Sequence, residues 1–300
     1  MALNGGVFEI DTLFIDQLTT PISDPVAIRV GGNARPLTAL TLRESTAEDI
    51  TGQLFSVYAL AVTMRDVSLE RITTSIEHPT AIEIGGADRM ATSVSLEAIS
   101  FDEIEGSALS VLALSSTISD LRLNELVGHG DNLAAIRVGG NGRSGAEATI
   151  NEITVENLLG AALSMDADFN FVIGSRFESI EVQDDTASIR IGGTEVPQLS
   201  SLRDLTIDAV LGQAVNITGQ RVRIESLDLQ NVTVDPSETA AIRVGASNRP
   251  AASFHGEALQ LREVDGQGVV VDSASVDLSN VVVSDSISPT ESLAFIHIAG

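Results

Sequence analysis

The sequence predicts an all-β solenoid of about eleven coils, each about 26 or 27 residues long. Three observations predict it: a recurring hexapeptide, a related tetrad halfway between its copies, and an apolar–polar alternation inside both. Self-similarity at a fixed period of this length is the signature of stacked repeats. It therefore outweighs the usual expectation of two domains for 300 residues. We expect residues 1–300 to form one repeat array with no separate cap domain.

The hexapeptide Ala27-Ile28-Arg29-Val30-Gly31-Gly32 returns in diverged form at regular intervals. Its later copies begin at Ala81, Ala135, Ser188, Ala241 and Phe295. Related tetrads begin halfway between them, at Leu54, Ala108, Ala162, Ala214 and Gly268. The period is therefore about 26 or 27 residues, with odd and even coils alternating in a superrepeat of about 53 or 54 residues.

Within the tetrads, the second and fourth positions are apolar in all eleven copies, and the third is polar or charged in all but Val270. This alternation predicts a strand with one buried face. Between tetrads, apolar residues fall in pairs two apart, separated by short breaks, which predicts short strands joined by tight corners. A glycine stands two residues before each even tetrad, where it suits a corner with positive φ; these are Gly52, Gly106, Gly160, Gly212 and Gly266.

This layout resembles the right-handed parallel β-helix superfamily, which includes pectin lyases, polygalacturonases, phage tailspikes and bacterial surface adhesins. The resemblance covers all 300 residues and is closest in character to adhesin or fibre repeats. It implies a right-handed parallel β-helix. Because it rests on pattern rather than on a family signature, it implies little about function.

The composition limits the classes of partner and the cellular location that we expect. The net charge of −25 disfavours nucleic acid and anionic membrane surfaces. Cysteine is absent, and no apolar run is long enough for a membrane span. All 17 basic residues are arginine, which indicates either a salty or extracellular environment or a genomic base bias. We expect an extracellular or cell-surface protein without membrane insertion.

The search for catalytic chemistry favours a protein that is not an enzyme. Two short motifs resemble parts of a polygalacturonase-like site: Gly128-His129-Gly130 and the Asp184–Asp185 pair. In that family the aspartate pair precedes the histidine, whereas here it follows. The regular period also leaves no room for the long loops that usually build active sites. The four histidines, at 78, 129, 255 and 297, are not at metal-ligand spacing. We predict no catalytic residues, no metal and no cofactor.

Arginine recurs at the outward third position of the odd tetrads, at Arg29, Arg137, Arg190 and Arg243. A second column follows the glycine turn, at Arg35, Arg89, Arg143 and Arg249. With coils about 4.8 Å apart, the charges recur every 10 Å or so. One interpretation is a ligand or lateral-contact stripe for a repetitive anion such as an acidic glycan, because arginine binds carboxylates in bidentate fashion. The other is an internal charge ladder with the acidic residues that precede each odd tetrad.

The end coils predict self-association, since uncapped coils expose unpaired backbone and apolar core. Phe8, Ile10, Phe295, Ile296 and Ile298 are the expected end-to-end contacts. Partners are then a second copy in a head-to-tail homopolymer or the remainder of a longer repeat chain. The predicted function is a non-enzymatic extracellular fibre subunit or adhesin stalk; the alternative is a glycan-binding or polysaccharide-degrading β-helix.

Overall fold

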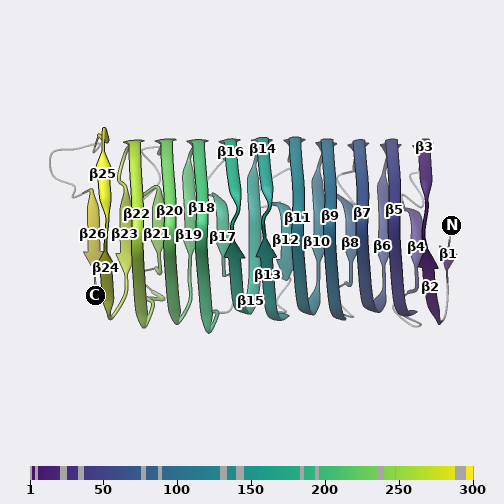
Figure 1. Cartoon of the computed structure of the whole chain (residues 1–300), viewed down its shortest axis with the longest axis horizontal. Coiled ribbons are helices and arrows are strands. Elements are labelled where there is room, and N and C mark those ends of the chain that lie inside the picture. The colour runs from purple at the N-terminus through teal and green to yellow at the C-terminus, as the bar shows by residue number, and fades with distance from the viewer. Residues whose placement is uncertain are drawn as a thin grey trace.

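The computed structural model of the chain describes residues 2–3, 6–20, 26–32, 37–75, 79–86, 90–128, 134–139, 145–182, 186–192, 196–234, 240–246, 248–287 and 295–299. These residues form 26 strands and contain no helix. Every pairing between the named strands is parallel, and the strands follow one another in chain order along the long axis (Figure 1). The protein is therefore all-β and built from stacked parallel strands, as a β-solenoid requires.

Sheet A contains the tetrads, which form short strands with one residue outward between two buried ones. In β4, for example, Ile28 and Val30 are buried and Arg29 is exposed, so the predicted alternation is confirmed. Its strands are β1 (Ala2–Leu3), β4 (Val26–Val30), β6 (Gln53–Val57), β8 (Thr80–Ile84), β10 (Ser107–Val111), β12 (Ala134–Gly139), the first part of β15 (Ala161–Ile173), β17 (Ala187–Ile191), β19 (Gln213–Ile217), β21 (Ile242–Val244), β23 (Val269–Asp272) and β26 (Ile296–Ala299).

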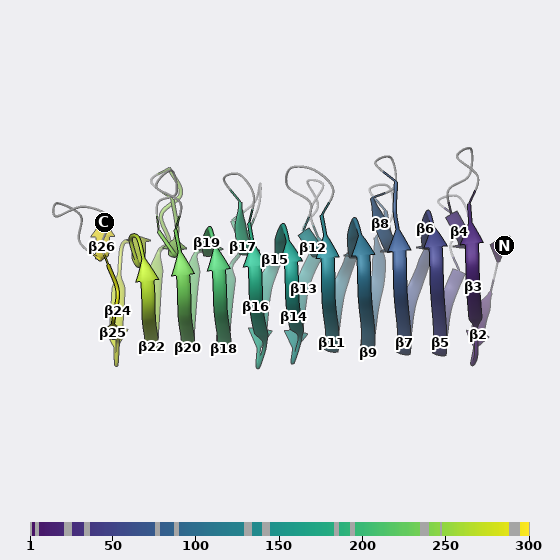
Figure 2. The same cartoon turned by 90° about the horizontal axis from the view of Figure 1, so that it is seen from above.

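Sheet B lies across the core from sheet A and contains the longer strands (Figure 2). They are β2 (Val7–Ile10), β3 (Phe14–Thr19), β5 (Leu37–Thr51), β7 (Ala59–Thr73), β9 (Ala91–Glu105), β11 (Ala113–Val127), β13 (Gly145–Asn151), β14 (Thr154–Leu159), the end of β15, β16 (Arg176–Glu181), β18 (Leu199–Leu211), β20 (Arg221–Thr233), β22 (Ser253–Asp265), β24 (Val276–Ser279) and β25 (Val282–Ser284).

The corners of sheet B differ from the prediction of separate short strands. Strands such as β5 keep their pairing through two bends, at Glu44 and Asp49, whose φ angles are 46° and 55°. The same pair of left-handed residues, five positions apart, recurs at Ala98 and Glu103 in β9. The predicted glycine corners are confirmed, since Gly52 and its four counterparts have φ between 110° and 123°.

The two sheets repeat with different registers. In sheet A, partners are about 27 residues apart, which is one coil, as in Ile28–Phe55. In sheet B, most partners differ alternately by 32 and by 22 in residue number, as in Ser68–Ser100 and Asp102–Asn124. The cause is that longer connections flank the odd sheet-A strands on both sides, whereas single residues flank most even ones. Residues 31–36 separate β4 from β5, but Tyr58 alone separates β6 from β7.

The space between the sheets is filled by one continuous aliphatic cluster. Phe101, Phe177 and Phe254 are among the largest fully buried side chains in it. Burial of this apolar surface is the main force that holds the coils together. Between the bends, alternate side chains of the strands mostly face that core, and the outward side chains form rows along the molecule.

Candidate functional site

The outward residues of the sheet-A tetrads form one ladder along the molecule. Each is the direct parallel partner of the next, in the order Arg29, Ser56, Glu83, Ser110, Arg137, Ser164, Arg190, Asn216, Arg243, Val270 and His297. Small polar residues separate most of the charged ones. The four arginines of the stripe are therefore aligned on one face of the sheet, at least two coils apart.

The stripe arginines differ in exposure. Arg29 and Arg190 are exposed, whereas Arg137 and Arg243 are half-buried. Arg29, Arg137 and Arg243 each have a contact of their own within the chain. In the part of the chain that the structure describes, the guanidinium of Arg190 makes no hydrogen bond or ion pair. Arg190 is thus the stripe residue best placed to reach a ligand.

A groove of about 360 Å³ lies over this part of sheet A. It crosses β17, β19 and β21, and its floor carries Arg190, Asn216 and Arg243 in direct register. Thr218 adds a hydroxyl to the wall. Two guanidinium groups on either side of an amide can hold two carboxylates of one extended acidic ligand, because each presents a planar fork of donors.

A glycine turn closes one side of the groove. Gly245 has φ +73°, and a Cβ atom there would lie 2.3 Å from the carbonyl oxygen of Asp272 in the next coil. Its amide donates to the carbonyl of Ile217 in the preceding coil at 2.9 Å. Only glycine allows this close stacking of turns, so the groove wall is fixed by the backbone.

The second predicted arginine column is described only in part. Arg249 is exposed and forms a two-residue antiparallel bridge with Ala246, through backbone hydrogen bonds of 2.7 and 3.1 Å. Arg35, Arg89 and Arg143 lie outside the described residues. So do His129 and the Asp184–Asp185 pair of the alternative catalytic hypothesis. The acidic residues expected to pair with the stripe also lie outside: Asp24, Glu77, Asp131, Asp185, Glu238 and Glu291.

Most arginines described on sheet B form ion pairs with carboxylates. Arg262 donates from Nη2 to both carboxylate oxygens of Asp228, at 2.8 and 2.6 Å. Arg176 donates from Nε to Oε2 of Glu178 at 2.9 Å. In each pair, the side-chain hydrogen bond and then the charge of the carboxylate raise the pKa of the guanidinium. The Arg262 pair therefore links β22 to β20, whereas the Arg176 pair lies within β16, and both guanidinium groups already bind a carboxylate.

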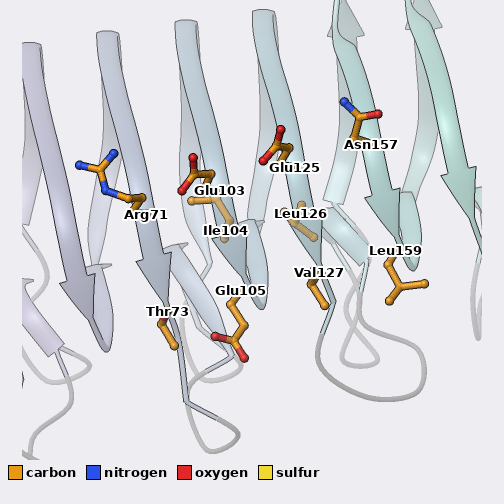
Figure 3. A pocket seen from close by; sticks show the side chains of 10 residues that line it. All are labelled: Arg71, Thr73, Glu103, Ile104, Glu105, Glu125, Leu126, Val127, Asn157 and Leu159. Carbon is orange, nitrogen blue, oxygen red and sulfur yellow. The ribbon is translucent and has the colours of Figure 1, made fainter.

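A second groove, of about 550 Å³, lies on sheet B and is mainly acidic (Figure 3). Its wall carries the second left-handed corner residue of four successive coils: Arg71, Glu103, Glu125 and Asn157. Arg71 does not neutralise this groove, because its guanidinium binds Glu48, Asp49 and Glu70. Glu103, Glu105 and Glu125 therefore dominate it, so its charge is opposite in sign to that of the arginines in the sheet-A groove.

The sequence did not predict one cluster of side chains on sheet B. His255 lies beside Glu257 on β22, Glu225 on β20 and Asp277 on β24. The register explains the omission: His255 pairs with Arg223, whereas the uniform period of the tetrads would place it beside Asp228 or Leu229. The alternating register of sheet B, applied to the His255-Gly256-Glu257 sequence, is the signal that would have placed Glu225 next to this histidine.

The predicted end-to-end residues lie at the two ends of the core. Phe8, Ile10, Phe295 and Ile296 are half-buried and pack against it, and Ile298 is 50% exposed. Their interior counterparts are covered on both sides: Leu40 and Leu42, which pair with Phe8 and Ile10, are 2% and 1% exposed.

Comparison with models of known protein families finds no match for this chain. Searches of curated proteins and of solved structures also find no significant match. Among the described residues, no helix has the length and apolar character needed to cross a membrane.

Proposed function

We propose that this chain is a non-enzymatic structural protein of the extracellular space or cell surface. In this proposal it is a right-handed parallel β-helix of about eleven coils, and its end coils stack head to tail on a second copy. Such stacking would give a fibre or the stalk of an adhesin. The proposal rests on the unpaired strand edges and the exposed apolar side chains of the two end coils.

In the part of the chain that the structure describes, both ends leave strand edges and core columns uncovered. Among the described residues, β2 and β3 pair only with β5, and β24 and β25 pair only with β22. Val283 stands in the same inward column as Leu261, yet it is 42% exposed where Leu261 is 0% exposed. Open parallel edges with apolar columns favour pairing with another strand.

The geometry of the two ends is compatible with one continuous stack. A solenoid has a direction, so β24 and β25 of one copy would meet β2 and β3 of the next in parallel. In that arrangement β26 would take the place that β1 now occupies beside β4, where Ala2 pairs with Arg29. The four residues of β26 would then replace the two of β1, which lengthens the sheet-A pairing across the joint.

Electron microscopy of the purified chain over a range of salt and protein concentration tests the proposal. We expect filaments with an axial repeat near 50 Å, from eleven sheet-B layers about 4.8 Å apart. Val283→Glu should abolish them, because it places a charge on the inward column at the joint. Val282→Glu is the matched control, since Val282 pairs with Gln260 in the outward column. Discrete rods at all concentrations, or equal filaments from Val283→Glu, would contradict the proposal.

A second candidate function is binding of an anionic glycan, which the sheet-A groove favours. Polygalacturonate should bind with an affinity that falls as salt rises. The double variant Arg190→Gln, Arg243→Gln should weaken binding by about 10-fold or more, since each charge-assisted hydrogen bond contributes roughly 1.5–3 kcal/mol. Arg203→Gln, whose arginine pairs with Asp204 at 3.2 Å on sheet B, is the control. Product release that is lost on changing Asp184 and Asp185 would instead support a polysaccharide-degrading enzyme.

A further inference from the structure

Three adjacent strands near the C-terminal end of sheet B bring five titratable side chains together on the outer face. Arg223 on β20 pairs with His255 on β22, which in turn pairs with Asp277 on β24. Two residues further along, Glu225 pairs with Glu257. The parallel ladder therefore fixes the backbone positions of these groups, which is the rigid support that a metal site needs.

The distances fit ligands of one small cation. His255 Nε2 lies 3.6 Å from Glu257 Oε2 and 4.0 Å from Glu225 Oε1. The three ligand atoms all lie within 4.8 Å of one another. Two ligands that are each about 2.0–2.2 Å from a zinc ion stand at most 4.4 Å or so apart. Both histidine–carboxylate distances are already inside that limit.

Asp277 sets the orientation of the imidazole. Its Oδ2 lies 3.1 Å from His255 Nδ1, so it can accept a hydrogen bond from Nδ1–H in the tautomer that a metal ion on Nε2 requires. Metal-binding histidines usually have such a carboxylate on the nitrogen that does not bind the metal. Asp277 is thus a positioning residue, separate from the ligand atoms themselves.

The local charge also favours a divalent cation. Arg223 Nη2 forms an ion pair with Glu225 Oε1 at 2.6 Å, and it is the only arginine in this group of side chains. Three carboxylates then face one guanidinium. The carboxylate of Glu225 has enough lone pairs to hold an ion while it accepts from Arg223.

We propose that Glu225, His255 and Glu257 bind a divalent transition-metal ion of the zinc type, oriented by Asp277. One imidazole nitrogen with carboxylate oxygens suits such ions better than it suits calcium or magnesium. The ion joins β20 to β22, so it acts as a clip between two coils. This inference is independent of head-to-tail stacking.

Titration of the chelator-treated full chain with Zn²⁺ alone, followed by calorimetry, tests the site. We expect one equivalent bound per chain and a higher unfolding midpoint in Zn²⁺ than in chelator. His255→Ala should weaken binding by more than 10-fold. Glu257→Gln, at a side chain 48% exposed, should also weaken it without disturbing the fold. Asp277→Asn should weaken it by roughly 10- to 100-fold.

His297→Ala is the matched control, because His297 lies on sheet A next to Val270 and should leave Zn²⁺ binding unchanged. Co²⁺ gives a second readout: its visible absorption should show a nitrogen ligand in the wild type and in His297→Ala, and lose it in His255→Ala. The proposal is overturned if the wild type takes up no stoichiometric Zn²⁺, or if His255→Ala and His297→Ala bind it equally.

Discussion

Sheets A and B cover the same core but make their turns by different means. After the odd sheet-A strands the chain turns on glycine; at Gly85, a Cβ atom would lie 2.3 Å from the carbonyl oxygen of Leu112. In sheet B, non-glycine residues such as Ala98 and Glu103 adopt φ angles of 53° and 51°. The difference teaches that a φ near 50° alone does not demand glycine in this chain. Close approach of the next coil's backbone does.

The outer faces differ in the same way. On sheet B, arginine side chains such as Arg71 and Arg262 are held by carboxylates of the same or neighbouring coils. On sheet A, serine and asparagine separate the stripe arginines along the ladder. Arginine thus forms ion pairs with carboxylates on sheet B and recurs in one register-aligned row on sheet A.

The largest effect should come from the sheet-A turn. Gly85→Ala should lower the free energy of unfolding by about 2–4 kcal/mol, because the new methyl group overlaps a backbone oxygen as well as favouring a different φ. Chemical denaturation followed by circular dichroism measures this. Gly174→Ala is the control: it has φ +61° on sheet B, and its nearest neighbour is Glu152 Cγ at 3.5 Å. Its loss of unfolding free energy should stay near 1 kcal/mol. Equal losses in the two variants would show that contact with the next coil's backbone does not determine the effect.

The opposite substitution on sheet B should have a smaller effect of opposite sign. Ala98→Gly should raise the free energy of unfolding by at most about 1 kcal/mol, because glycine relieves the left-handed strain at φ 53°. The gain is limited by the greater freedom of glycine in the unfolded chain. The same denaturation experiment measures it, and clear destabilisation would show that the Ala98 methyl group contributes to packing.

The smallest expected effect is a difference in thermal midpoint between an arginine variant on sheet B and one on sheet A. Arg262→Gln should lower the thermal midpoint slightly, and the loss should shrink in high salt because exposed ion pairs are screened. Arg190→Gln should leave the midpoint unchanged, since the Arg190 guanidinium makes no hydrogen bond or ion pair among the described residues. Calorimetric scans at low and high salt compare the two variants. A larger loss for Arg190→Gln would mean that the stripe has a structural role.

The sequence could predict the features that local pattern controls. The tetrad alternation placed Ile28 and Val30 inward and Arg29 outward, because a strand has a period of two. It also located corner glycines such as Gly52, because their conformation requires that residue. The left-handed corners at Ala98 and Glu103 left no such signature, since those residue types are common everywhere.

The side-chain cluster around His255 could not be predicted from the sequence for a different reason. Its members meet only because His255 pairs with Arg223, whereas the uniform period of the tetrads indicates a partner near Asp228. The groove at Arg190 and Arg243 was easier to anticipate, because sheet A follows the uniform period.

The alternation of long and short register steps in sheet B has a consequence for how such a chain can change length. Removing a single coil would place two long or two short sheet-B steps next to each other and would break the alternation of odd and even tetrads. Removing or adding two coils together preserves the alternation on both sheets. The unit of growth is therefore a cassette of about 53 or 54 residues, and each one gained by duplication would lengthen the rod by about 10 Å without redesign of its surface.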